Sequence, residues 1–348
     1  MQTYKVVGIM SGTSLDGVDL AYCEFAFDKQ WTYKLLEAET IPYTSEWKNM
    51  LSTLPSAKAE KFVAVHAELG KYFGKLSKDF CHRYNLKPDF ISSHGHTIFH
   101  QPSAGFTSQI GDGAALAVES GFPVICDFRA ADVALGGQGA PLVPIGDKLL
   151  FHEFDYCLNL GGIANISFEQ NSKRIAFDIC GCNLLLNALS SRVGKEYDAG
   201  GELAAKGKVR KDLLDKVNQS KYFEKSFPKS LGREDLETDI FPVFDRPGIP
   251  VEDLLATFCE HIAMQIGKCL SAGNVLITGG GAHNDFLIEK IKSYSPAKVV
   301  IPDSKLVNFK EALIFAFLGV LRMRNEVNCL SSVTGASRDS SGGAIWQP

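Results

Sequence analysis

The sequence lacks the marks of several large classes of protein. Its longest apolar run, Ala312 to Leu321, is only about half as long as a membrane-spanning helix. The N-terminus shows no charged stretch followed by an apolar core and a cleavage site, so we expect no secretory leader. Lys and Arg do not cluster between aromatic residues, and the formal net charge is −4, which argues against a nucleic-acid partner. We therefore expect a soluble intracellular protein with no membrane or nucleic-acid partner.

Several cysteine and nucleotide motifs are also missing. The nine cysteines are odd in number and follow no regular spacing, which indicates reduced thiols and a cytoplasmic location. The P-loop motif Gly-x-x-x-x-Gly-Lys-Ser/Thr, the dinucleotide motif Gly-x-Gly-x-x-Gly and the protein-kinase signatures do not occur. Any nucleotide site must therefore be built in another way.

The 348 residues suffice for two domains, and the hydrophobic pattern predicts one order of elements twice, β-β-β-α-β-α-β. In the first half we expect strands at 4–10, 18–25, 31–43, 90–93 and 123–128, and helices at 57–85 and 112–120. In the second half we expect strands at 156–160, 164–168, 175–179, 274–278 and 297–301, and helices starting near 183 and at 251–270, 284–293 and 309–324. This repeat predicts a duplicated α/β fold whose two domains face each other across a cleft. We place the first domain at residues 1–127 plus 338–348 and the second at 128–337, with an irregular insertion at about 197–248.

A turn rich in glycine and hydroxyl residues separates the first two expected strands. Glycine lets the backbone approach an anion closely, and hydroxyl and turn N–H groups can donate to phosphate oxygens. Two carboxylates beside the turn are candidate ligands for the Mg²⁺ that accompanies a nucleotide, namely Asp16 and Asp19. The alternative is an ordinary β-hairpin. The candidate nucleotide-binding residues are Gly12, Thr13, Ser14, Asp16, Gly17 and Asp19.

Two further glycine turns follow strands of the second half. Gly161 and Gly162 lie between its first two strands, so the two opening hairpins resemble each other and could hold a triphosphate from both sides. Gly279, Gly280 and Gly281 end a strand before a helix, where backbone N–H groups can meet a ligand. A tight turn between two closely packed strands is the alternative for Gly161 and Gly162.

Asp178 follows the apolar strand 175–177 and is the candidate general base, able to take a proton from water or from a sugar hydroxyl. The alternative is a turn or helix-capping Asp, although Asn183 is better placed to cap the next helix. His94, His96 and His100 lie in one polar segment, but no further ligand completes a metal set. We therefore expect hydrogen bonding or sugar binding there.

Two charged residues stand near the expected domain junction and the last helix. Arg129 offers a planar fork for a carboxylate, or else forms an ion pair with Asp127 or Asp132. Glu311 is either a first-turn carboxylate that interacts with the helix dipole or a site residue.

Together these segments resemble the anhydro-N-acetylmuramic acid kinase family in the family's order along nearly the whole chain. The matching segments are Gly8–Asp19, Ser93–His100, Gln109–Asp112, Asp127–Arg129, Gly136–Pro144, Asn159–Ile166 and Gly279–Asn284. The resemblance implies the actin-like ATPase fold, with two ribonuclease-H-like domains and ATP in the cleft. It also implies an unusual activity in cell-wall recycling, in which one enzyme hydrolyses the 1,6-anhydro ring of anhydro-N-acetylmuramic acid and phosphorylates the freed O6 with ATP and Mg²⁺.

The resemblance also assigns roles to residues. The turn from Gly12 to Asp19 would bind the ATP phosphates, Asp178 would activate water, and Arg129 would hold the sugar through its lactyl carboxylate. His96, Thr97 and Glu311 are further candidate contacts of the sugar. The chain departs from the family pattern in the turn 179–182 and at His96, where the family usually carries Gln. A kinase for another sugar, and a nucleotide-binding protein with little phosphotransfer, therefore remain alternatives, and a homodimer is left open.

Overall fold

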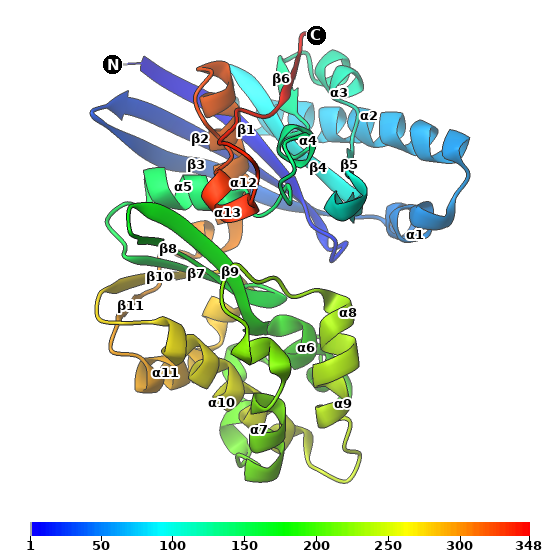
Figure 1. The fold of residues 1–348 in the computed structure, drawn as a ribbon. Helices are drawn as coiled ribbons and strands as arrows, with labels where there is room; N and C mark the ends of the chain where they lie inside the picture. The colour runs from blue at the N-terminus through cyan, green and yellow to red at the C-terminus, as the bar shows by residue number, and fades with distance from the viewer. Residues whose placement is uncertain (1) are drawn as a thin grey trace. The chain divides into compact units, whose positions relative to one another are not determined.

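The computed structural model describes residues 2–348, which form two compact units. One unit comprises Met1–Leu150 and Phe309–Pro348, and the other comprises Phe151–Asn308 (Figure 1). Each unit is a β-sheet covered by helices, as expected for an α/β fold.

The first unit contains a sheet of seven strands in the order β12-β6-β4-β1-β2-β3, with β5 paired to β4. Strands β1, β2 and β3 form an antiparallel meander, and β4 then runs parallel to β1 and β6 parallel to β4. The strands are β1 Gln2–Ser11, β2 Gly17–Asp28, β3 Gln30–Pro42, β4 Phe90–Gln101, β5 Phe106–Ile110, β6 Val124–Cys126 and β12 Ala344–Trp346.

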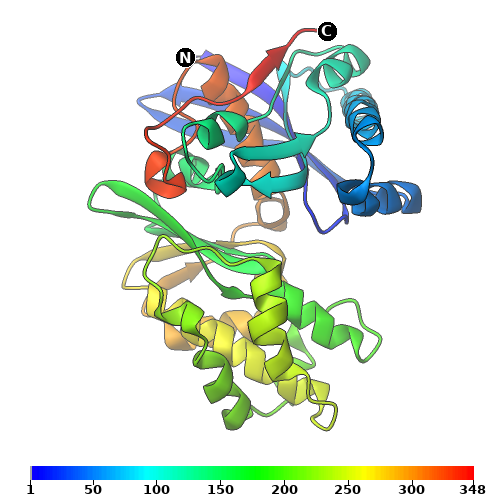
Figure 2. The ribbon, with the colours of Figure 1, turned by 45° about the vertical axis from the view of Figure 1, so that its right-hand side comes forward.

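Helices cover both faces of this sheet (Figures 1 and 2). The helices are α1 Ser45–Thr53, η1 Leu54–Ser56, α2 Ala59–Arg83, η2 Pro102–Ala104, α3 Gly113–Ser120, α4 Ala130–Ala134, α5 Val143–Leu150, α12 Ser304–Met323 and α13 Ser331–Thr334. On one face Val7 and Ile9 pack with Leu69 and Phe73 of α2. On the other face α12 lies so close to β1 that a Cβ atom at Gly8 would overlap the carbonyl oxygen of Ala312. The alternation along β1 thus supplies apolar side chains to one face and a close approach to the other.

The second unit contains a five-stranded sheet in the order β11-β10-β7-β8-β9. Its strands are β7 Tyr156–Leu160, β8 Ile163–Gln170, β9 Lys173–Gly181, β10 Asn274–Thr278 and β11 Lys298–Val300. Its longer helices are α6 Asn183–Ser191, α7 Lys211–Asn218, α10 Val251–Cys269 and α11 Asp285–Tyr294. The shorter ones are η3 Ala199–Gly201, η4 Ala204–Lys206, η5 Lys221–Glu224, α8 Arg233–Asp235, η6 Leu236–Ile240, α9 Phe241–Phe244 and η7 Gly280–His283.

The two sheets share one strand order. The path β3-β2-β1-β4-β6 of the first unit corresponds to β9-β8-β7-β10-β11 of the second, each with an antiparallel meander followed by two parallel strands. This confirms the predicted duplicated α/β fold, with two ribonuclease-H-like units.

Several bounds differ from the sequence-based ones. The units divide at 150/151 and 308/309 rather than at 127/128 and 337/338. The reason is packing: α5 and the part of α12 from Phe309 onward belong to the first unit, where a Cβ at Gly146 would lie 2.7 Å from Ile314. The last long helix starts at Ser304 rather than at 309, so Glu311 lies in its third turn, and its interpretation as a first-turn carboxylate is wrong.

Candidate functional site

The turn between β1 and β2 carries the first group of candidate residues. Thr13, Ser14 and Asp16 are exposed, and the N–H of Leu15 donates to the carbonyl oxygen of Gly12 at 3.3 Å. A Cβ atom at Gly12 would meet only the Ser14 hydroxyl, at 3.6 Å, so the backbone of this turn is open to a ligand.

Gly17 lies on the same turn, but the packing of β2 against β3 already explains why this position carries glycine. A Cβ atom there would lie 2.5 Å from the carbonyl oxygen of Ile41 on β3. This glycine therefore allows the close pairing of β2 and β3, whatever else it contacts.

Two candidate magnesium ligands flank the turn. An oxygen of Asp19 accepts a hydrogen bond from the Thr40 hydroxyl at 2.6 Å, while burial and the nearby charge of Asp16 raise the pKa of Asp19.

The carboxyl of Glu311, a predicted sugar contact, also has a raised pKa, because desolvation outweighs the opposing effect of the Arg129 charge. Within residues 2–348 no three His, Cys, Asp or Glu side chains gather as a complete metal site.

Arg129 forms an uncommon pair with a histidine. Its Nε and Nη2 atoms donate to Nε2 of His94 at 3.1 and 2.8 Å, and its Nη1 donates to the carbonyl oxygen of Gly139 at 2.7 Å. Because arginine has no acceptor, Nε2 of His94 accepts, and its Nδ1–H donates to the carbonyl oxygen of Gly95 at 3.0 Å. Burial and the Arg129 charge lower the pKa of His94, in agreement with this neutral form.

These contacts replace the ion pair that was the alternative for Arg129. Asp132 accepts instead from the Gly139 N–H at 2.8 Å and from the Thr334 hydroxyl at 2.8 Å. Three of the five guanidinium N–H groups are engaged, so Arg129 retains one N–H on each terminal nitrogen. One donor on each terminal nitrogen can bind the two oxygens of a carboxylate.

The other predicted sugar contacts of this unit lie on β4. Nδ1 of His96 lies 2.9 Å from the Ser11 hydroxyl, which also contacts the Tyr43 hydroxyl at 2.7 Å. His96 is only 3% exposed, and burial lowers its pKa to about 4, so the ring is neutral at pH 7. The hydroxyl of Thr97 accepts from the Gln109 amide at 3.3 Å.

In the second unit the first glycine turn meets the start of α6. The carbonyl oxygen of Gly162 accepts from the N–H groups of Cys182 and Leu184, and that of Gly161 accepts from Asn183. The turn therefore uses its carbonyls to satisfy helix N–H groups that would otherwise lack partners. The prediction that Asn183 caps α6 is wrong, because the cap residue is Cys182 and the Asn183 amide donates to Leu160 instead.

Asp178 lies within β9, opposite Asn165, three residues before the strand ends at Gly181. Its Oδ2 atom accepts from the Leu231 N–H at 2.9 Å. Burial raises the pKa of the carboxyl, and this hydrogen bond partly opposes the rise. A strand position excludes the alternative of a helix cap.

The residues after Asp178 that differ from the family pattern are core residues. Ile179 is 2% exposed, and Cys180 and Cys182 are fully buried. A Cβ at Gly181 would lie 2.8 Å from Leu236. The altered turn therefore packs against the interior.

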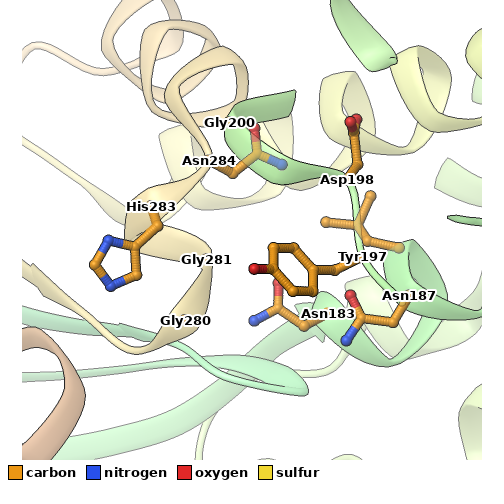
Figure 3. Close-up of a pocket in the computed structure, with 10 residues that line it drawn as sticks. Asn183, Asn187, Tyr197, Asp198, Gly200, Gly280, Gly281, His283 and Asn284 are labelled. Carbon is orange, nitrogen blue, oxygen red and sulfur yellow. The ribbon is translucent and has the colours of Figure 1, made fainter. Parts of the chain in front are cut away.

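The third glycine turn borders a pocket of about 310 Å³ (Figure 3). Figure 3 shows the Tyr197 ring directed across the pocket toward the segment of Gly280 and Gly281. Gly279 is set back, with φ of 84° and its N–H bonded to the carbonyl oxygen of Val307. The lining residues are Asn183, Leu186, Asn187, Tyr197, Asp198, Gly200, Gly280, Gly281, His283 and Asn284.

Among the residues that line this pocket, only Gly280 and Gly281 were predicted as site residues from the sequence. Tyr197, Asp198 and Gly200 come from the insertion, whose irregular pattern carries no periodic signal. Nor did the sequence indicate that Tyr222 and Leu231, also in the insertion, would contact Asp178.

Comparison with known proteins gives a consistent result. The family model described as anhydro-N-acetylmuramic acid kinase matches residues 4–348. The chain is 35% identical over 374 aligned residues to the anhydro-N-acetylmuramic acid kinase of Saccharophagus degradans, covering 100% of both chains. It is 34% identical to that of Vibrio parahaemolyticus, covering 98% of this chain and 97% of the relative. Among solved structures, component A of the (R)-2-hydroxyglutaryl-CoA dehydratase of Acidaminococcus fermentans is 12% identical, with a TM-score of 0.47 over 90% of this chain and 96% of that chain. No helix within residues 2–348 has the length and apolarity to cross a membrane.

Proposed function

Because the chain belongs to the anhydro-N-acetylmuramic acid kinase family, we propose that it converts anhydro-N-acetylmuramic acid, water and ATP into N-acetylmuramic acid 6-phosphate and ADP. In this reaction water adds to the anomeric carbon, the bond from that carbon to O6 breaks, and O6 takes the γ-phosphoryl group. The product is an intermediate of peptidoglycan recycling. The observation that carries the proposal is the family match over nearly the whole chain, with a half-buried carboxylate at Asp178 whose pKa is raised by desolvation.

Asp178 is the proposed general base. A base works best when its pKa lies near the working pH, and burial moves the pKa of Asp178 upward in that direction. The Leu231 N–H holds one oxygen of the carboxylate, which leaves the other oxygen to take a proton from water. The water then attacks the anomeric carbon as its proton moves to Asp178.

Arg129 is the proposed anchor for the sugar. Its two remaining N–H groups fit the lactyl carboxylate, and the bonds to His94 and Gly139 fix the plane of the guanidinium. We assign His96, Thr97 and Glu311 to the same sugar site. Positioning of this kind lowers the entropic cost of reaction.

We assign nucleotide binding to the glycine turns predicted from the sequence, each described within its own unit. The pocket beside Gly280 and Gly281 has the volume of a small-molecule site and a mainly apolar surface with several polar side chains, and the Tyr197 ring offers a flat face for a nucleoside base. The open turn at Gly12, with Thr13 and Ser14, offers donors to phosphate oxygens. We also assign phosphate contacts to Gly161 and Gly162 and to the backbone at Gly279, and we include Gly17 among the residues of the first turn.

Magnesium fits the first turn only together with phosphate. Asp16 and Asp19 supply two carboxylates, and the pKa of Asp19 is raised partly by its neighbour, so a cation would relieve their repulsion. Mg²⁺ usually takes one or two carboxylates and fills its other positions with phosphate oxygens and water. When bound, it would screen the charge on the transferred phosphoryl group.

The cysteines support a reducing location. All nine are free thiols, and eight of them are buried. We therefore propose that the reaction takes place in the cytoplasm, where thiols stay reduced. A homodimer remains a prediction.

The test is product analysis after incubation with Mg²⁺-ATP and anhydro-N-acetylmuramic acid. We expect a phosphorylated sugar that is heavier than the substrate by one water and one phosphoryl group. The Asp178→Asn variant should still bind ATP but should not form this product. Phosphorylation of glucose or N-acetylmuramic acid alone would favour a kinase for another sugar. ATP binding without any phosphorylated sugar would favour a binding protein and contradict the proposal.

A further inference from the structure

The insertion between α6 and α10 holds Asp178 through three hydrogen bonds. The Tyr222 hydroxyl donates to the carbonyl oxygen of Asp178 at 2.6 Å. The Leu231 N–H donates to its Oδ2 at 2.9 Å, and the Asp178 N–H donates to the carbonyl oxygen of Lys229 at 3.3 Å. A segment of ten residues therefore contacts the backbone donor, the backbone acceptor and the side chain of one residue.

The segment is itself fixed by packing against β9. Phe227 stacks on Phe177, the residue before Asp178, with ring centroids 5.4 Å apart and an interplanar angle of 4°. The Lys229 ammonium lies 4.7 Å from the centre of the Tyr222 ring, which is itself only 7% exposed. Rings and backbone together leave this segment little freedom to shift along the strand.

From this geometry we propose that residues 222–231 are a positioning device for the base: Tyr222 fixes the strand at Asp178, and the Leu231 N–H fixes the carboxylate rotamer, so that one oxygen faces the reacting water. Tyr222 and Leu231 are positioning residues and do not contact the substrate. The inference rests on the proposed function of Asp178 and adds to it a part of the chain that the sequence alone marked only as an irregular insertion.

The surroundings of Asp178 make the Leu231 N–H the main partner of the carboxylate. Burial raises the pKa values of Tyr222 and Cys180, so both stay protonated near neutral pH. The Lys229 ammonium is directed at aromatic rings, and the Lys225 ammonium lies over the Tyr222 ring. The charged and titratable groups around Asp178 and the segment that holds it are Tyr222, Lys225, Lys229, Lys268, Cys180, Cys269 and Asp235.

The first test is Tyr222→Phe in the full-length protein, with Tyr84→Phe as the matched control on an exposed tyrosine of the other unit. We expect Tyr222→Phe to lower kcat for sugar phosphorylation by about 10-fold to 100-fold, the size of effect that a small misplacement of a reacting group produces. KM for both substrates should stay within about twofold, because no binding contact is removed. An unchanged kcat in a folded Tyr222→Phe protein would overturn the proposed role of Tyr222.

The second test removes the Leu231 N–H by an amide-to-ester replacement at that position, which keeps the side chain. Since this hydrogen bond favours the ionised carboxylate, its loss should move the acidic limb of the kcat profile upward by about one pH unit. A ¹³C-labelled carboxyl at Asp178 should titrate with the same shift in NMR, independently of turnover. An unmoved titration would overturn the role of Leu231.

The experimental results that would refute the proposed function differ from those that would refute the positioning device. Wild-type protein without product would refute the function, while the NMR titration would still report on the Leu231 contact. Normal wild-type turnover, an inactive Asp178→Asn and unaffected segment variants would refute the positioning device alone.

Discussion

Arg129 donates two hydrogen bonds to the Nε2 atom of His94, at 2.8 and 3.1 Å, and this pair orients the guanidinium. The histidine accepts both bonds only in its neutral form, and Phe315 packs against the ring with centroids 4.6 Å apart. An arginine held in this way keeps its charge but loses its rotational freedom. Its two remaining donors are therefore prearranged for a planar anion.

Arg129→Lys should raise KM for anhydro-N-acetylmuramic acid by at least about 10-fold, because lysine presents a point charge instead of a planar fork. ATP binding should change by less than about twofold. Steady-state kinetics and calorimetric titration of ATP measure the two quantities. Arg83→Lys, at an exposed pair with Glu39, is the matched control.

A substrate without the carboxylate sharpens this prediction. The anhydro form of N-acetylglucosamine lacks the lactyl group, so Arg129→Lys should barely alter its kinetics. The two substrates and two proteins form a cycle that isolates the interaction of Arg129 with the carboxylate. Equal losses on both substrates would mean that Arg129 acts through the fold rather than through this contact.

Alanine substitutions at Gly8 and Gly12 should distinguish a loss of stability caused by packing from a loss of activity caused by a blocked ligand site. A Cβ at Gly8 overlaps the carbonyl oxygen of Ala312, so Gly8→Ala should lower the free energy of unfolding by about 2 kcal/mol or more. Gly12→Ala has room, and its backbone does not need a positive φ, so the thermal midpoint should stay within about 2 °C. Its ATP turnover should nevertheless fall about 10-fold, because the added methyl group lies at the proposed phosphate site. Unchanged turnover would remove Gly12 from that site.

Gly280 and Gly281 offer the same comparison in the pocket of the second unit. A Cβ at Gly280 meets only the Asn183 amide, at 3.5 Å, whereas one at Gly281 lies 2.7 Å from the side chain of Leu160. Gly280→Val should therefore raise the Kd for ATP by about 10-fold with an unchanged unfolding transition, as calorimetric titration would measure. Gly281→Val should destabilise the fold itself. If Gly280→Val binds ATP normally, this pocket is not the nucleoside site.

The strands and long helices were predictable because their hydrophobic periods are strong. The strands of the two meanders were predicted from such segments, for example Tyr156–Leu160, where the predicted and observed bounds coincide, whereas the order in which the strands pair was not predicted. Strands β5 and β12 were not predicted, and β4 runs to Gln101 although the predicted strand ended at Ser93 and a turn was expected after it. Strand β12 has only three residues, too few to show a period, and its pairing partner β6 is distant in sequence. The start of α12 was misplaced because Ser304–Asn308 adds only one apolar turn before the long buried run.

In the candidate site, too, some residues could be predicted from the sequence and others could not. Gly280 stands out by residue type and by its place after a strand, and Asp178 stands out as a single charge in an apolar strand segment. The contacts around Asp178 do not, because the N–H of Leu231 and the carbonyl oxygen of Lys229 are backbone groups that any residue supplies. The His94–Arg129 pair was missed for another reason: charge rules favour a carboxylate partner for arginine, and a neutral histidine is an uncommon acceptor.

The buried histidine His96 should make stability depend on pH in a predictable direction. Its pKa is about 4 in the folded protein and about 6.5 in an unfolded chain, so the unfolded chain binds more protons between these values. Stability must then fall as the pH drops from 6.5 toward 4, by about 1.4 kcal/mol per pH unit and about 3 kcal/mol in total from this residue. Asp19 and Asp178, whose pKa values are raised, act in the opposite direction, because the folded state takes up their protons earlier. The wild-type curve alone therefore does not isolate the contribution of His96.

The comparison that isolates it is His96→Gln against wild type, with His82→Gln on the exposed end of α2 as control. Urea denaturation at intervals from pH 4 to pH 7 gives the free energy of unfolding of each protein. The free energy of unfolding of His96→Gln minus that of wild type should increase as the pH falls. His82→Gln measures what the loss of an exposed histidine does under the same conditions. A constant difference for His96→Gln would mean that the ring takes up its proton equally well in the folded protein, against the burial that holds it beside Ser11.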